Sequence, residues 1–197
     1  MRSHLTRIFL AGIALIVSSC VAPDTRHHVI ISVPQQRMAL LDNGALIATY
    51  PISTSKFTIG DSPGSRGTPL GELEIAEKIG GNAPSGAVFK DRRRTGEILA
   101  PDAPGRDPIV TRILWLRGRE AQNANAYGRY IYIHGTPEER NIGKPASFGC
   151  IRMRSRDVIQ LYDAVGWGAK VTIVNDPLEA MVPAAPSAPT VADAMKQ

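Results

Sequence analysis

The feature that most constrains the fold of this 197-residue chain is a series of short β-rich runs separated by turn residues. Residues 38–41 and 45–50 flank Asn43-Gly44. Asn-Gly accepts the positive φ angles of a tight type I′ turn, so we expect a β-hairpin here. Further strand-like runs follow at residues 70–79, 109–116, 129–133 and 171–174. The pattern predicts a mostly β domain over residues 28–176.

One helix is expected before the last strand. Its apolar residues recur at i, i+3, i+4 and i+7, at Val158, Leu161, Tyr162 and Val165. Ser155 can cap this helix and Gly166 can end it. Residues 80–107 are rich in Gly, Pro and Arg, without sustained periodicity. This long loop is either a lid over a site or an insertion without catalytic importance.

The first residues of the chain indicate export. Residues 1–19 hold Arg2 and Arg7 ahead of an apolar run at residues 8–17. This run is too short for a transmembrane helix, which needs about 20 apolar residues, but is typical of a signal peptide. Residues 17–20 (VSSC) resemble the lipobox of bacterial lipoproteins, in which the chain is cut before a cysteine that is then acylated.

That resemblance makes Cys20 the lipidated first residue of the mature chain, followed by a tether over residues 20–27. We therefore expect a lipid-anchored periplasmic protein, and Val21 after the cysteine favours the outer membrane. The alternative is a plain signal peptide cleaved near Ala22, with Cys20 discarded. At the other end, residues 177–197 are rich in Pro and Ala, which predicts a flexible tail.

Composition excludes several classes of protein. Two cysteines and four histidines are too few for a zinc finger or a disulfide scaffold, so we expect no metal and no cofactor. Removing residues 1–19 removes two arginines and no acidic residue, which lowers the net charge from +5 to +3. Aromatic residues make up only 6% of the chain, and we expect no nucleic-acid partner because such proteins combine basic and aromatic residues.

His134 and Cys150 carry the strongest chemical signal. His134 lies at the end of the sequence YIHGT, and Cys150 lies in the glycine turn of SFGCIRM. A nearby imidazole can take the proton from a thiol nucleophile, and backbone N–H groups at Gly149 can stabilise the resulting oxyanion. Alternatively, Cys150 is a small buried apolar residue and His134 is a hydrogen-bonded strand end. However, an exported chain leaves Cys150 without a disulfide partner, which favours a functional thiol.

These segments resemble the active-site signature of the L,D-transpeptidase catalytic domain (YkuD-type), in which HG(T/S) precedes SHGCIR(M/L). The resemblance extends to residues 51–54 (PIST), 67–71 (GTPLG) and 166–174. It implies a β-sandwich with one or two short helices. It also implies action on peptidoglycan stem peptides, with carbapenem β-lactams as covalent inhibitors.

The resemblance assigns roles to individual residues. It makes Cys150 the nucleophile that forms a thioester, His134 the general base and acid, and Gly135 the group whose carbonyl orients His134. Gly149 would belong to the oxyanion hole. Substrate binding would fall to Arg152, Ser147 and Tyr132.

Phe148 departs from the family pattern, which commonly has a second histidine at this position. The substitution leaves His134 as the imidazole available to Cys150. Two other functions therefore remain possible for this chain. One is an L,D-carboxypeptidase or endopeptidase, in which water resolves the thioester, and the other is an inactive wall-binding lipoprotein.

Overall fold

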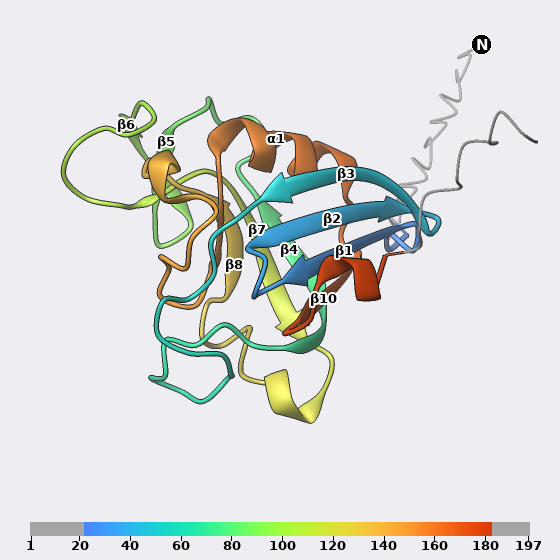
Figure 1. Cartoon of the computed structure of the whole chain (residues 1–197). Coiled ribbons are helices and arrows are strands. Elements are labelled where there is room, and N and C mark those ends of the chain that lie inside the picture. The colour runs from blue at the N-terminus through green and yellow to red at the C-terminus, as the bar shows by residue number, and fades with distance from the viewer. Residues whose placement is uncertain (1–21, 183–197) are drawn as a thin grey trace, which may run out of the picture.

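The computed structural model describes residues 22–182, and β-strands dominate this part of the chain (Figure 1). The strands are β1 His27–Ser32, β2 Arg37–Asp42, β3 Ala45–Pro51, β4 Gly71–Ile79, β5 Ala87–Lys90, β6 Arg93–Ile98, β7 Ile109–Gly118, β8 Tyr132–Gly135, β9 Ile151–Met153 and β10 Lys170–Val174. The α-helix is α1 Ser155–Ala164, and the short 3-10 turns are η1 Ala121–Asn123, η2 Glu139–Asn141 and η3 Leu178–Ala180.

The strands form one mixed sheet in the order β3-β2-β1-β10-β4-β7-β5-β6, with β8 paired to β7 and β9 paired to β8. The β1–β10 and β8–β9 pairs are parallel. In Figure 1 the strands β3, β2, β1 and β10 lie in front of β7 and β8. Apolar side chains from both groups of strands and from α1 meet in one core, which includes Val29, Leu40, Leu114, Ile133 and Leu161. The expected mostly β, two-layered fold with one α-helix is confirmed.

The β-hairpin predicted at Asn43-Gly44 is present in the structure. Asn43 and Gly44 have φ angles of 48° and 82°, as a type I′ turn requires, and they join β2 to β3. The strand expected at residues 129–133 begins later, at Tyr132. Tyr130 has a φ of 59°, which strand geometry does not allow, so the preceding turn runs three residues further than predicted.

The helix forms where predicted, but Ser155 does not cap it. Arg154 occupies the cap position without a side-chain hydrogen bond, and Ser155 is the first helical residue. The Ser155 hydroxyl instead pairs with the Thr111 hydroxyl on β7 at 2.7 Å. The helix ends at Ala164, two residues before Gly166. Tertiary contacts thus replace the predicted local cap.

The segment at residues 80–107 is not an unstructured loop, because it contains β5 and β6. These strands are joined at Asp91 and Arg92, whose φ angles of 50° and 66° make a tight turn. β5 also pairs with β7 through Val88↔Val110. The resulting hairpin projects from the sheet at one side of the molecule (Figure 1).

Both ends of the described chain are attached to the domain. The Asp24 carboxylate accepts hydrogen bonds from the Gly166 N–H at 2.6 Å and from the His27 N–H at 3.1 Å. Leu178 is buried with Ile30 and Ala39 on the outer face of the sheet, so the tail boundary predicted at residue 177 is too early. The predicted signal peptide, Cys20 and most of the predicted tail lie outside residues 22–182. None of the helices between residues 22 and 182 is long and apolar enough to span a membrane.

Candidate active site

The parallel pairing of β8 with β9 brings the two predicted catalytic segments together. In this register Ile133 lies beside Ile151, and His134 lies beside Arg152. Ile133 and Ile151 are fully buried in the main core. Because successive strand residues point to opposite faces, His134 and Arg152 point away from that core. Cys150 immediately precedes β9, so the same pairing brings its turn close to β8.

His134 is held in one orientation by its own strand. Its Nδ1 donates a hydrogen bond to the Gly135 carbonyl at 2.8 Å, which leaves Nε2 as the basic nitrogen. The imidazole is only 5% exposed. Burial lowers its pKa from 6.5 to about 4, and the positive charge of Arg152 acts in the same direction. At neutral pH His134 is therefore an uncharged base that can accept a proton.

Cys150 is a free, partly buried cysteine whose thiol donates to the Tyr130 carbonyl at 3.4 Å. It packs against the apolar cluster that contains Trp115 and Tyr132. Burial raises the pKa of the thiol, against the opposing effects of a Tyr132 backbone hydrogen bond and the charges of Arg152 and Arg129. The resting thiol is protonated at neutral pH.

The two groups thus rest as a neutral thiol and a neutral imidazole. This arrangement differs from a preformed thiolate–imidazolium pair. A neutral imidazole can act as a general base that takes the proton of a thiol while the thiol attacks a carbonyl. Together the two groups can support nucleophilic acyl transfer. Across residues 22–182, no cluster of three or more His, Cys, Asp or Glu side chains could bind a metal.

The turn before Cys150 is fixed by its neighbours. Gly149 has a φ of 124°, and a Cβ atom there would lie 3.1 Å from the Gly67 carbonyl oxygen. The Gly149 carbonyl accepts a hydrogen bond from the Thr68 hydroxyl at 3.0 Å. The Gly149 N–H, predicted to serve the oxyanion hole, donates to the Ser147 hydroxyl at 3.2 Å. Glycine is therefore required both for the backbone conformation and for the close approach of residues 66–68.

Ser147 is fully buried, and its hydroxyl donates to the Cys150 carbonyl at 2.5 Å. This hydrogen bond, together with the one that the same hydroxyl accepts from the Gly149 N–H, stabilises the turn at residues 147–150. The predicted contact of Ser147 with substrate would require that turn to open. Tyr132, by contrast, lines a pocket beside Cys150.

Arg152 is buried at 8% side-chain exposure and pairs with Asp107 at 2.6 Å. Glu138 lies 3.9 Å from the same guanidinium. Asp107 also accepts from the Thr136 hydroxyl at 2.5 Å. A substrate carboxylate would have to join or displace these partners, while the Arg152 charge already acts on both His134 and Cys150.

A pocket of about 360 Å³ lies beside the nucleophile, lined by Phe89, Asp91, Arg92, Ile109, Tyr130 and Tyr132. The Arg92 guanidinium lies over the rings of Trp115 and Tyr130, at 5.0 and 5.2 Å. The tip of the β5–β6 hairpin therefore forms one wall of this pocket. This position favours the lid reading of residues 80–107 over an insertion remote from the site.

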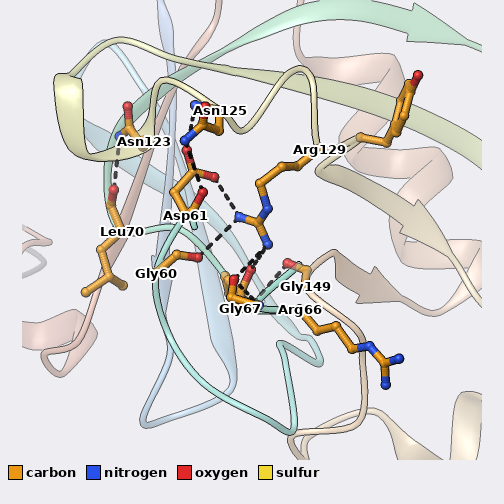
Figure 2. Close-up of polar contacts among 12 residues, drawn as sticks. Gly60, Asp61, Arg66, Gly67, Leu70, Asn123, Asn125, Arg129 and Gly149 are labelled. Atoms are coloured by element: carbon orange, nitrogen blue, oxygen red, sulfur yellow. Dashed lines mark hydrogen bonds and ion pairs between the residues drawn. The ribbon is translucent and has the colours of Figure 1, made fainter. Parts of the chain in front are cut away.

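A partly buried arginine, Arg129, connects Asp61 to the backbone at Gly67, next to the turn that carries Cys150 (Figure 2). Arg129 forms an ion pair with Asp61 at 2.6 Å and donates to the Gly67 carbonyl at 2.9 Å. The Asp61 carboxylate also accepts from the Asn125 N–H at 2.6 Å. Figure 2 shows Arg129 reaching between Asp61 and Gly67, with Gly149 and Arg66 beside Gly67. The network holds residues 60–67 against the turn that carries Cys150.

Sequence reasoning missed several of these supporting residues. Asp107 and Arg129 carry no motif, and their partners lie 45 and 68 residues away in the chain. Thr68 lies within a segment that was recognised, but its hydrogen bond to Gly149 depends on tertiary contact. Arg92 belongs to the segment at residues 80–107, whose composition alone does not single out one arginine as part of a pocket.

Comparison with known proteins now gives the family. The model of the L,D-transpeptidase catalytic domain, YkuD, matches residues 26–173. The chain belongs to the L,D-transpeptidase catalytic-domain family. It is 29% identical over 164 residues to the Bacillus subtilis protein named as an L,D-transpeptidase, YkuD, covering 83% of this chain and 76% of that protein. It is 28% identical over 162 residues to the Escherichia coli L,D-transpeptidase homologue YcfS, covering 80% of this chain and 47% of that protein.

Solved structures of the family share the fold. An L,D-transpeptidase from Enterococcus faecium superposes with a TM-score of 0.50 at 15% identity, covering 77% of this chain and 50% of that chain. A carbamoyl enzyme formed by Ldtfm with avibactam gives a TM-score of 0.50 at 16% identity, with the same coverage. The chain thus spans about half the length of several relatives that it matches.

Proposed function

We propose that this protein is a cysteine-dependent L,D-transpeptidase that acts on peptidoglycan stem peptides through a thioester. The observation that carries the proposal is the arrangement on β8 and the turn before β9. His134 is oriented by the Gly135 carbonyl at 2.8 Å and kept neutral by burial. It lies on β8, which pairs with β9, the strand that directly follows the free cysteine Cys150. Family membership supports the reaction class.

The first half-reaction follows from these protonation states. Nε2 of His134 takes the thiol proton while the Cys150 sulfur attacks the carbonyl of the third stem residue, giving a tetrahedral oxyanion. Collapse of the intermediate breaks the bond to D-alanine, and the imidazolium returns its proton to the leaving amine. The product is a thioester on Cys150 and free D-alanine. The turn amides around Gly149 would stabilise the oxyanion, with Ser147 releasing its bond to the Gly149 N–H.

In the second half-reaction an acceptor amine attacks the thioester carbonyl. His134 takes a proton from the amine and gives one to the departing Cys150 sulfur. An amine on a neighbouring stem peptide gives a 3,3-type crosslink, and a lysine on a wall lipoprotein gives a protein attachment. Tyr132 and Arg152 would contribute to substrate binding, Tyr132 from the pocket wall and Arg152 through its charge.

The acceptor separates transferase from hydrolase. The protein is incubated with a tetrapeptide stem fragment, with and without excess amine acceptor, and the products are weighed. A transpeptidase gives an amide product with the mass of the tripeptide joined to the acceptor. Exclusively hydrolysed tripeptide would contradict the transferase assignment, and recovery of intact tetrapeptide would favour an inactive wall-binding protein.

We also propose that the chain is exported and anchored to a membrane through acylated Cys20, with the outer membrane favoured. The support is the VSSC sequence that follows an apolar run. Mass spectrometry of the mature N-terminus tests this: the proposal predicts an acylated Cys20, and cleavage near Ala22 would contradict it. Carbapenems are expected to acylate Cys150. Ldtfm, the neighbour solved with avibactam, carries a carbamoyl group.

A further inference from the structure

Phe148, the residue that departs from the family signature, belongs to an exposed aromatic pair. Its side chain is 53% exposed, and its ring lies 5.3 Å from the ring of Phe57, which is 49% exposed. Two phenylalanines that remain this exposed lose much of the stabilisation that burial would give them. Adjacent exposed aromatic rings of this kind mark a surface for a ligand.

Two cations flank the rings. Lys56 Nζ lies 4.8 Å from the centre of the Phe148 ring, and the Arg66 guanidinium lies 5.6 Å from it. Both cations are exposed. None of the ion pairs found among residues 22–182 involves either of them. We call this surface the aromatic–cationic platform; it consists of Lys56, Phe57, Arg66 and Phe148. It thus carries positive charge that no carboxylate of the described chain neutralises through an ion pair.

The backbone beneath this platform is tightly connected to the nucleophile turn. The Lys56 N–H donates to the Ser147 carbonyl at 3.1 Å. The Ser55 hydroxyl donates to the Arg66 carbonyl at 2.6 Å. Arg66 itself has a φ of 57°, a conformation uncommon for residues other than glycine. The backbone of the platform is therefore preorganised, and Phe148 lies two residues before Cys150 in the chain.

None of the four platform residues lines the pocket that contains Arg92 and Tyr132. The turn that carries Cys150 therefore connects two separate surfaces: Phe148 belongs to the platform, and the Cys150 thiol contacts Tyr130 of the pocket. One is the pocket under the β5–β6 hairpin, where Asp91 and Arg92 balance each other in charge, and the other is the platform with a charge of two. A two-substrate acyl transfer needs two sites of this kind.

Resting on the transpeptidase function proposed above, we propose that the platform binds a carboxylate next to the reacting nitrogen. In the first half-reaction this is the carboxylate of the departing D-alanine, and in the second it is the carboxylate of the incoming amino acid. The leaving D-alanine carries a carboxylate next to its reacting nitrogen. The incoming amine forms its bond at the same acyl carbon, so it must approach on the side that D-alanine vacates. The platform selects acceptors of one chemical class, α-amino carboxylates, over water and over lysine side-chain amines, which lack an adjacent carboxylate. The cations bind the carboxylate, and the rings bind the carbon atoms beside it.

Binding to the Cys150→Ser variant tests the platform without catalysis. The probes are a tetrapeptide ending in free D-alanine and the same peptide with a C-terminal amide, titrated by calorimetry. The acid binds about tenfold more tightly than the amide, as expected for charge-assisted hydrogen bonds to a carboxylate. Adding Lys56→Gln and Arg66→Gln reduces this preference to twofold or less, whereas the control Lys170→Gln, which removes a cation paired with Glu72, keeps it. Equal binding of acid and amide, or full preference in the double variant, would overturn the proposal.

Acceptor choice in the active protein provides the second readout. Transfer from the tetrapeptide donor to isotopically labelled D-alanine, which makes the exchanged product distinguishable by mass from the donor, is compared with transfer to D-alaninamide and to a blocked lysine with a free ε-amine. The wild type favours D-alanine about tenfold, and the Lys56→Gln/Arg66→Gln variant loses that preference. Equal transfer to all three amines in the wild type would refute acceptor selection. A protein that forms no thioester would refute the transpeptidase function, while the binding preference would still decide the fate of the platform.

Discussion

The ion pair between Arg152 and Asp107 gives a quantitative test of how the site is held. The pair is 2.6 Å long, with side-chain exposures of 8% and 16%. Removing one partner of a buried pair typically costs about 3–5 kcal/mol, because the other charge stays buried. Glu138 remains 3.9 Å from Arg152, and an asparagine at residue 107 can still accept from Thr136. We therefore expect Asp107→Asn to lower the free energy of unfolding by about 2–3 kcal/mol.

Denaturant unfolding and thermal melting measure this loss, which corresponds to a decrease in melting temperature of roughly 4–12 °C for a chain of this size. The substitution also leaves the Arg152 charge less neutralised, so the pKa of Cys150 falls relative to wild type. The pH dependence of alkylation by iodoacetamide reports that pKa. The control is Glu97→Gln, which breaks an exposed pair with Arg106 and costs less than about 1 kcal/mol. An Asp107→Asn protein as stable as this control, with an unchanged alkylation profile, would refute the reasoning.

Three further predictions concern the pH dependence, the turn and the lid. Because burial lowers the pKa of His134 to about 4, the rate at which a substrate acylates Cys150 should fall on the acid side with a midpoint near pH 4. The free energy of unfolding should decrease as the pH falls from about 6.5 towards 4, because in this range only the unfolded chain binds the extra proton. An acylation midpoint near pH 6.5 would contradict this. Gly149→Ala should slow acylation more than tenfold and cost about 1–3 kcal/mol, whereas Gly44→Ala, at a φ of 82° with no contact within 4 Å, should leave acylation unchanged. Arg92→Ala should raise the KM for the peptide donor several-fold, while the free energy of unfolding stays within about 0.5 kcal/mol of wild type. Arg94→Ala on β6 is the matched control, and equal KM values in the two variants would argue against Arg92 as part of the pocket wall.

The elements with local signals could be predicted from the sequence. The hairpin at Asn43-Gly44 forms because both residues tolerate positive φ, and α1 forms because its apolar spacing matches the helical repeat. The β5–β6 hairpin gave no such signal, because its turn uses Asp91 and Arg92 and every residue of β6 is exposed. No apolar alternation marks an exposed strand, so its pairing can be seen only in three dimensions.

The candidate site divides in the same way. His134, Gly135, Gly149 and Cys150 lie in two short motifs, and the structure brings these motifs together through the β8–β9 pair. Their supporting contacts come from distant parts of the chain. The ion pair of Arg152 with Asp107 and the burial that lowers the pKa of His134 are properties of the packed fold. Ser155 shows the converse, because a residue suited to a local cap is used in a contact with Thr111.

The most direct test of the central claim is the intact mass of the protein after incubation with a carbapenem. Acylation by a neutral thiol through a neutral imidazole predicts one covalent adduct located on Cys150, no adduct on Cys150→Ser, and loss of the adduct in His134→Ala. A folded wild-type protein without an adduct at Cys150, or a His134→Ala variant that is acylated at the wild-type rate, would contradict it.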